Sequence, residues 1–98
     1  MKTESEKIIE RKLVKMIKDS GCMCIKLLCD NILGLPDRLV LMPHNKCIFV
    51  ELKTTGKKPR KSQIFMHNKL KNLGFRVEVI DSINGVLNFV NSLYVNGK

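Results

Sequence analysis

The sequence lacks a long hydrophobic run. No segment approaches the roughly 20 apolar residues that a membrane-spanning helix needs, so we expect no membrane partner. The first twelve residues, MKTESEKIIERK, are charged and do not contain the apolar stretch of a signal peptide. We therefore expect the protein to remain in the cytoplasm.

Acidic residues are scarce relative to basic ones. The chain carries 18 lysines and arginines against 9 aspartates and glutamates, a formal net charge of +9. Such an excess favours a polyanionic partner, most often nucleic acid, although a basic surface can also serve solubility alone. Because aromatic residues make up only 5% of the chain, stacking on bases has little support. Contact with the phosphate backbone is favoured over readout of base sequence.

The cysteines do not have the spacing of a zinc site. Cys22, Cys24, Cys29 and Cys47 form no pair of C-x2-C motifs. In an intracellular protein they stay reduced. We expect structural thiols, with Cys22 and Cys24 on one face of a strand.

Length and periodicity predict one domain, residues 1–98, of the α/β class. The 98 residues are 44% hydrophobic and 28% charged, which suits a globular protein with a modest core. We predict helices over 3–20, 62–73 and 82–94, and strands over 22–29, 37–42, 47–53 and 75–80. The first three strands form a meander, and the second helix crosses over to the fourth strand. This order, α-β-β-β-α-β-α, predicts a mixed sheet flanked by helices.

Two acidic residues stand beside apolar strand segments in the stretch GLPDRLVLMPHNKCIFVELK, residues 34–53. Asp37 follows a proline, which suits the first residue of a strand. Glu51 and Lys53 are separated by one residue in the predicted third strand, so they point to the same face. A hairpin turn near Asn45 would pair residues whose numbers sum to about 89, so that Asp37 faces Lys53 or its neighbour Leu52. Two such carboxylates repel each other unless a cation lies between them, and oxygen ligands suit Mg²⁺ or Mn²⁺.

The first helix supplies a further acid. With Leu13 at the centre of its apolar stripe, Glu6 lies about 20° and Glu10 about 60° from that centre, at 100° per residue. Charge is unexpected so close to a buried face. The alternatives are that Glu6 interacts with the helix dipole and that Glu10 is an ordinary boundary residue.

The second helix places a polar residue at the head of an apolar stripe. The stripe consists of Gln63, Met66, Leu70 and Leu73. Gln63 orients a metal ligand, a water or the lysine, or else it caps the start of the helix. His67 flanks the stripe, where we expect a surface or boundary residue.

A basic loop follows the acidic residues. The segment KTTGKKPRK, residues 53–61, contains five cations. Next to a metal site such a loop would follow a phosphate backbone. The alternative is a flexible loop that only contacts solvent.

These motifs resemble the VRR-NUC (virus-type replication–repair nuclease) family of the PD-(D/E)XK nuclease superfamily. The likeness rests on GLPDRLVL, FVELK and KPRKSQ, with an upstream E-x-x-x-E-R-K-L-V. Pro36-Asp37 is followed after thirteen residues by Glu51-Leu52-Lys53, and the helical glutamate and Gln63 stand at the matching places. The resemblance extends from about residue 6 to about residue 80.

The resemblance implies a restriction-endonuclease-like αβββαβ core, followed here by a C-terminal helix, and Mg²⁺- or Mn²⁺-dependent hydrolysis of DNA. Asp37 and Glu51 match the metal-binding acids, the backbone carbonyl of Leu52 a further ligand, Lys53 the catalytic lysine and Gln63 the glutamine of the second helix. For the first-helix ligand we favour Glu10, because Glu10-Arg11 is similar to a pair in archaeal junction resolvases. Glu6, which is similar to the glutamate that begins many VRR-NUC domains, is the alternative.

The resemblance also implies partners. Stand-alone members of this size look like phage proteins that act as homodimers on branched DNA, including four-way (Holliday) junctions, in a bacterial or phage-infected host cell. We expect the nucleic-acid contacts to come from Lys26, Arg38, Lys57, Lys58, Arg60 and Lys61. One rival interpretation is a non-catalytic nucleic-acid-binding module of the same fold. Another is a protein-interaction domain in which the acids form salt bridges, so that Asp37→Ala would destabilise the fold.

Overall fold

The computed structural model describes residues 3–95 and confirms the predicted order of elements. They are α1 (Glu6–Asp19), β1 (Met23–Lys26), β2 (Arg38–Met42), β3 (Lys46–Leu52), α2 (Lys61–Asn72), β4 (Arg76–Ile80) and α3 (Ile83–Val95). The predicted tail at 95–98 lies outside the described residues except for Val95, where α3 ends. The fold class is α/β, as the sequence predicts.

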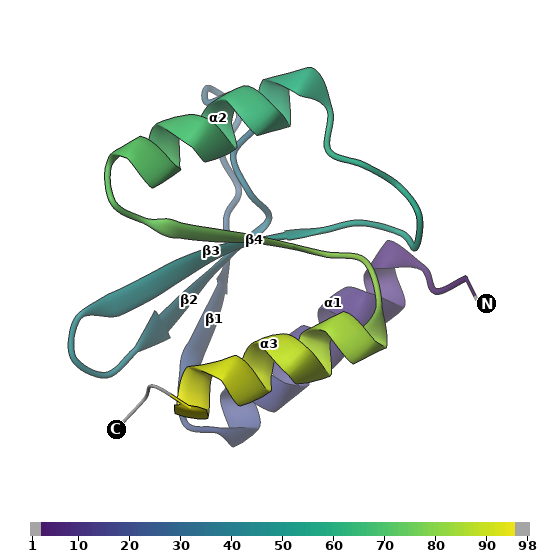
Figure 1. Cartoon of the computed structure of the whole chain (residues 1–98), viewed down its shortest axis with the longest axis vertical. Coiled ribbons are helices and arrows are strands. Elements are labelled where there is room, and N and C mark those ends of the chain that lie inside the picture. Colours follow the sequence, from purple (N-terminus) through teal and green to yellow (C-terminus); the bar gives the residue numbers. More distant parts are fainter. Residues whose placement is uncertain (1–2, 96–98) are drawn as a thin grey trace.

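The strands form one mixed sheet between two layers of helices. Its order is β1-β2-β3-β4, with β1, β2 and β3 antiparallel and β4 parallel to β3. Helices α1 and α3 lie together on one face of the sheet, and α2 covers the other face (Figure 1). In this part of the chain, no helix is long and apolar enough to span a membrane.

The main core lies between the sheet and the α1–α3 layer. Ile9, Leu13 and Ile17 recur once per turn on α1 and are fully buried. Their partners include alternate residues of β3, namely Ile48, Val50 and Leu52. Because side chains alternate along a strand, the intervening residues of β3 point to the other face of the sheet, toward α2. That second face carries the polar site.

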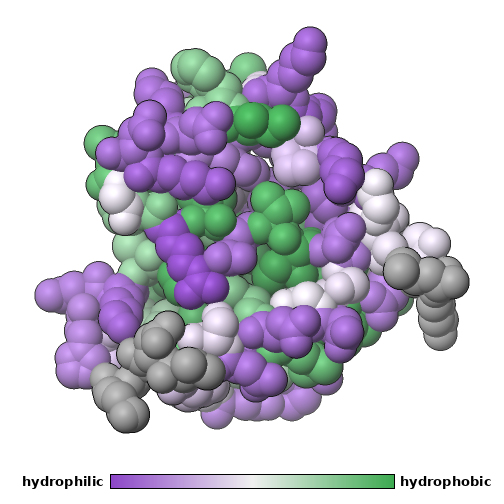
Figure 2. All heavy atoms as spheres, in the orientation of Figure 1, coloured by the Kyte–Doolittle hydropathy of each residue, from purple (hydrophilic) through white to green (hydrophobic). Residues whose placement is uncertain are grey.

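The edge strand β4 lies between the two helical layers. Figure 2 shows hydrophobic residues in the middle of this side of the molecule, with hydrophilic residues above and below them. Val79 of β4 is 43% exposed, whereas Ile80 is buried. Phe75, just before β4, packs edge-on against Phe49 of β3, with 5.5 Å between the ring centroids.

Strand β1 is shorter than predicted. It ends at Lys26, although the apolar letters of 22–29 suggested a longer strand. One residue after the strand, the Leu27 amide still donates a hydrogen bond to the Asp37 carbonyl at 2.9 Å. The next residue on the partner strand is Pro36, which has no amide hydrogen to donate. Residues 28–33 are therefore exposed.

The pairing of β2 with β3 differs by one residue from the expected register. The observed partners, such as Arg38 with Val50, sum to 88 instead of about 89. The turn holds His44 and Asn45 at φ 66° and 63°, and pairing resumes between Met42 and Lys46. The hairpin is therefore centred on His44, half a residue before the predicted centre.

The cysteines are free thiols. Cys22 and Cys24 are half-buried and pack against the main core. Cys29 is exposed, because it lies in the segment that the shorter β1 leaves outside the sheet.

Candidate active site

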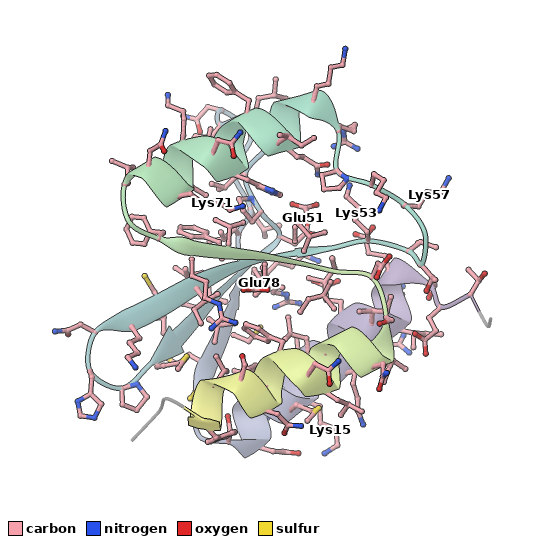
Figure 3. The ribbon with its side chains drawn as sticks, viewed as in Figure 1. Lys15, Glu51, Lys53, Lys57, Lys71 and Glu78 are labelled. Atoms are coloured by element: carbon pink, nitrogen blue, oxygen red, sulfur yellow. The ribbon has the colours of Figure 1, made fainter. Side chains whose placement is uncertain are left out.

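Asp37, Glu51 and Lys53 lie together at one end of the sheet. Asp37 immediately precedes β2, and Glu51 and Lys53 lie at the end of β3 on the side covered by α2 (Figure 3). The Leu52 amide donates a hydrogen bond to Asp37 Oδ2 at 2.8 Å. This bond fixes the start of β2 against the end of β3, and the expected proximity of Asp37 to Leu52 is confirmed.

Glu51 is a buried carboxylate with one partnered and one unpartnered oxygen. The residue is 1% exposed. Oε2 accepts from Gln63 Nε2 at 2.8 Å and lies 3.6 Å from Lys53 Nζ. Oε1 is buried and has no hydrogen-bond partner. Burial, and then the negative charge of Asp37, raise the pKa of Glu51 to about 7, against the lowering effect of Lys53.

Gln63 caps the start of α2, which is one of the expected alternatives, and also contacts Glu51. Its Oε1 accepts from the Arg60 amide at 2.7 Å, which satisfies a free amide at the start of α2. Its Nε2 donates to Glu51. One side chain therefore begins the helix and orients the buried carboxylate.

Gly34 permits α2 to begin this close to the sheet. The residue has φ +81°, and a Cβ atom there would lie 2.3 Å from the Ser62 carbonyl oxygen. Any other residue would push the first turn of α2 away. Because Gln63 follows Ser62 directly, the glycine also helps to set the distance from Gln63 to Glu51.

His67 is buried, and the expectation of a surface or boundary residue is wrong. The residue is 5% exposed, and Nε2 lies 3.6 Å from Glu51 Oε1. The buried face of α2 consists of Gln63, His67 and Leu70, whereas Leu73 of the predicted stripe is 73% exposed. The bond from Gln63 to Glu51 lies on this inward face of α2. The spacing of four residues from Gln63 was the signal in the sequence that could have identified His67.

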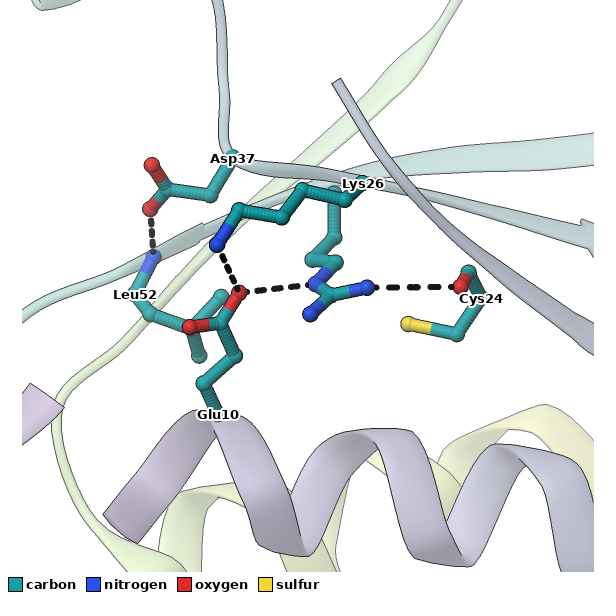
Figure 4. A network of polar contacts seen from close by, with 6 residues as sticks. Glu10, Cys24, Lys26, Asp37 and Leu52 are labelled. Atoms are coloured by element: carbon teal, nitrogen blue, oxygen red, sulfur yellow. Dashed lines mark hydrogen bonds and ion pairs between the residues drawn. The ribbon is translucent and has the colours of Figure 1, made fainter. Parts of the chain in front are cut away.

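Glu10 lies in a different group of polar residues. Arg38 Nε donates to Glu10 Oε2 at 2.8 Å, and Lys26 Nζ lies 3.9 Å from the same oxygen (Figure 4). Arg38 also reaches the Cys24 carbonyl at 3.5 Å. Since Arg38 follows Asp37 on an extended strand, the two side chains point to opposite faces. Arg38 lies on the α1 side, and two predicted nucleic-acid contacts, Lys26 and Arg38, pair with Glu10.

Glu6 stands close to the candidate site instead. Its amide donates to Thr54 Oγ1 at 3.1 Å, one residue after Lys53. Partial desolvation and then the charge of Asp37 raise the pKa of Glu6, while Lys53 lowers it. The side chain itself is exposed.

The basic loop is fixed at its start and exposed beyond it. The Thr55 amide donates to the Glu4 carbonyl at 3.0 Å, and the Gly56 amide donates to Asp81 Oδ2 at 3.2 Å. The four cations that follow are exposed: Lys57, Lys58, Arg60 and Lys61. Figure 3 shows Lys57 pointing outward on the same side of the molecule as Lys53. No pattern in the sequence indicated the contacts of Glu4, whose Oε1 also accepts from the Ile83 amide at 2.8 Å and holds the start of α3.

The acidic residues partly meet the requirements of a metal site. Among residues 3–95, no three His, Cys, Asp or Glu side chains are grouped closely enough to hold an ion. The negative charge of Asp37 nevertheless helps to raise the pKa of Glu51, and Glu51 Oε1 is a buried oxygen without a partner. A buried carboxylate with a raised pKa and an unpartnered oxygen fits a hard divalent cation. The bound cation would give that oxygen a partner and would stabilise the negative charge.

Comparisons with known proteins identify a similar phage protein and a similar solved structure. No family model matches the sequence. A protein of Acyrthosiphon pisum secondary endosymbiont phage 1, described as "Putative nuclease p44", is 39% identical over 93 residues, which are 93% of this chain and 100% of the phage protein. A solved structure described as "VRR_NUC domain" superposes with a TM-score of 0.77 at 24% identity, covering 97% of this chain and 100% of its own.

Proposed function

Because the chain belongs to the family of this phage nuclease and has the fold of a VRR_NUC domain, we propose that it is a Mg²⁺- or Mn²⁺-dependent endonuclease that hydrolyses phosphodiester bonds in DNA. The observation that carries the proposal is the buried Glu51 beside Asp37 and Lys53. A buried carboxylate with a raised pKa and one unpartnered oxygen is energetically costly if its role is only structural. It is suited to a cation.

The proposed ligands come from the ends of β2 and β3. Asp37 and Glu51 supply carboxylates, and the Leu52 backbone carbonyl supplies a further oxygen. For the ligand from α1, the geometry supports Glu6 over Glu10. Glu10 already has Arg38 at 2.8 Å on the opposite side of the sheet, whereas Glu6 is affected by the charges of both Asp37 and Lys53.

The reaction divides between the cation and the chain. A bound divalent cation would polarise the scissile phosphate and make water a better nucleophile at neutral pH. Lys53 supplies a fixed positive charge 3.6 Å from Glu51 Oε2, where it stabilises negative charge developing on a phosphate oxygen. Gln63 keeps Glu51 in place through its bond to Oε2.

The DNA would approach over the basic loop. Lys57, Lys58, Arg60 and Lys61 are exposed directly after Lys53, so their charges can contact phosphates on either side of the scissile bond. Lys26 and Arg38 remain proposed contacts. Because Arg38 is bound to Glu10, we expect Arg38 to contribute less than the loop.

We propose branched DNA, including four-way junctions, as the substrate and a homodimer as the active form. A two-fold dimer presents two equivalent sites, which suits paired cuts on a symmetric junction. An exposed apolar patch supports self-association: Ile32, Leu33, Phe65 and Met66 line one groove of about 370 Å³. Leu33 and Phe65 are 78% and 65% exposed.

Light scattering tests whether this patch joins two copies. If it does, Phe65→Ser should be a monomer. If the molar mass of Phe65→Ser equals that of wild type, the patch no longer supports self-association.

A cleavage assay tests the proposal. A labelled four-way junction, a linear duplex and a single strand of matched sequence are incubated with Mg²⁺, Mn²⁺ or EDTA. We expect metal-dependent cutting, fastest on the junction. Tight binding without cutting in either metal would favour the alternative, a non-catalytic nucleic-acid-binding module of the same fold.

A further inference from the structure

His67 and Glu51 each bury one polar atom that has no partner. Glu51 Oε1 and His67 Nε2 are the two buried side-chain nitrogen or oxygen atoms without a hydrogen bond in the part of the chain that the structure describes. They lie 3.6 Å apart. This distance is beyond a hydrogen bond, but a small closing movement brings the atoms into range.

We propose that His67 is a positioning residue that holds Glu51 Oε1 by donating from Nε2 when a divalent cation binds. The proposal rests on the metal dependence proposed above. Each carboxylate oxygen has two lone-pair directions. If Gln63 occupies one on Oε2 and His67 one on Oε1, the remaining directions stay open to the cation.

The position of His67 on α2 supports this role. It lies four residues after Gln63, on the same inward face of the helix. The two side chains therefore approach the two oxygens of one carboxylate from a single rigid element. Carboxylates that bind metals are usually oriented by such outer hydrogen bonds, whose loss weakens metal affinity by about 10–100-fold.

The geometry leaves Nε2 of His67 one acceptor to which it can donate. A neutral imidazole carries one N–H. Glu51 Oε1 lies 3.6 Å from Nε2, and both atoms are buried without another hydrogen-bond partner.

The test is the affinity of the protein for Mn²⁺ without DNA, measured by electron paramagnetic resonance and titration calorimetry. Leucine in His67→Leu fills the space but cannot donate, and we expect the Kd for Mn²⁺ to rise about 10–100-fold. His67→Gln keeps an N–H near the position of Nε2 and should recover most of the affinity. Asn68→Leu changes the exposed neighbour on the same helix and serves as the control, with an unchanged Kd.

A second measurement needs no variant and therefore does not depend on folding of His67→Leu. The ring nitrogens of the wild-type protein are followed by NMR while Mg²⁺ is added. The His67 Nε2 signal should move to the position of a hydrogen-bonded N–H, whereas the exposed His44 should not respond.

The outcomes separate this inference from the proposed function. If wild type binds Mn²⁺ and His67→Leu binds it equally well, the inference is overturned and the metal site stands. Equal losses in His67→Leu and His67→Gln, or an unresponsive His67 signal, also overturn it, because they indicate packing instead of a donated bond. If wild type binds no divalent cation, both the inference and the proposed metal dependence fail.

Discussion

Arg38 donates a 2.8 Å hydrogen bond to Glu10 on the α1 side of the sheet, while its neighbour Asp37 points to the α2 side. Because side chains alternate along a strand, these two adjacent residues belong to different groups of polar residues, one on each face of the sheet. It separates Glu10 from Glu51 and leaves Glu6, at the first position of α1, as the helical acid on the side of the candidate site.

This separation predicts different effects for the two glutamates of α1. Glu6→Gln should weaken Mn²⁺ binding at least about tenfold, with little change in the melting temperature, because Glu6 is exposed. Glu10→Gln should keep the affinity but lose about 1–3 kcal/mol of stability, since it removes the charged partner of the half-buried Arg38. Calorimetric titration and urea denaturation measure the two effects. The reverse pattern would assign the metal to Glu10.

Glu51 links the stability of the metal-free protein to pH. Its pKa is about 7 in the folded protein, against an ordinary value of 4.5. Between these pH values the folded protein holds a proton that the unfolded chain has released. The contribution of Glu51 to the free energy of unfolding therefore falls as pH rises through this window and is constant above it.

Replacing Glu51 by glutamine should remove this dependence. We expect the stability of Glu51→Gln relative to wild type to increase by a few kcal/mol between pH 4.5 and 7, because one pKa unit corresponds to about 1.4 kcal/mol. Urea denaturation in EDTA at a series of pH values measures the difference. A difference that does not change with pH would mean that Glu51 titrates normally.

Asp37 combines a repulsive charge with a useful hydrogen bond. Asp37→Asn keeps an oxygen to accept from the Leu52 amide and removes the charge that raises the pKa of Glu51. Without metal it should be as stable as wild type or more so. Asp37→Ala leaves the buried Leu52 amide without its acceptor and should be about 1–3 kcal/mol less stable than Asp37→Asn.

Thermal melts of both Asp37 variants in EDTA distinguish this account from a protein-interaction domain held by salt bridges. In that rival, removing the charge leaves a cation without its partner, so Asp37→Asn should melt well below wild type. Because Asp37→Ala also removes the acceptor of the Leu52 amide, a loss of stability in that variant alone does not separate the two accounts.

The basic loop should dominate the electrostatic part of DNA binding. Replacing Lys57, Lys58, Arg60 or Lys61 by alanine should weaken binding to all DNA sequences alike. Each lost phosphate contact should reduce the slope of log K against log salt by about 0.9. Fluorescence anisotropy in EDTA at several salt concentrations gives the slope. Lys46, exposed in the β2–β3 turn region, is the matched control, and an equal effect of Lys46→Ala would argue for unspecific attraction.

The sequence was informative wherever local patterns determine structure. Ile9, Leu13 and Ile17 define the buried face of α1, and the spacing of two residues between Glu51 and Lys53 predicts that both lie on the same side of the sheet. Contacts made by distant segments were not accessible in this way. The inward turn of His67 depends on the bond from Gln63 to Glu51, and the pairing of Glu10 with Arg38 depends on how α1 lies across β2.

The most direct test of the central claim is the cleavage rate of Lys53→Met on a four-way junction with Mg²⁺ or Mn²⁺, compared with wild type and Lys57→Met. Methionine keeps most of the length of the side chain but removes the charge beside Glu51. The account predicts metal-dependent cutting by wild type, a loss of at least about a hundredfold in Lys53→Met, and near wild-type cutting at saturating DNA in Lys57→Met. Equal cutting by all three proteins would contradict a catalytic site at Asp37, Glu51 and Lys53.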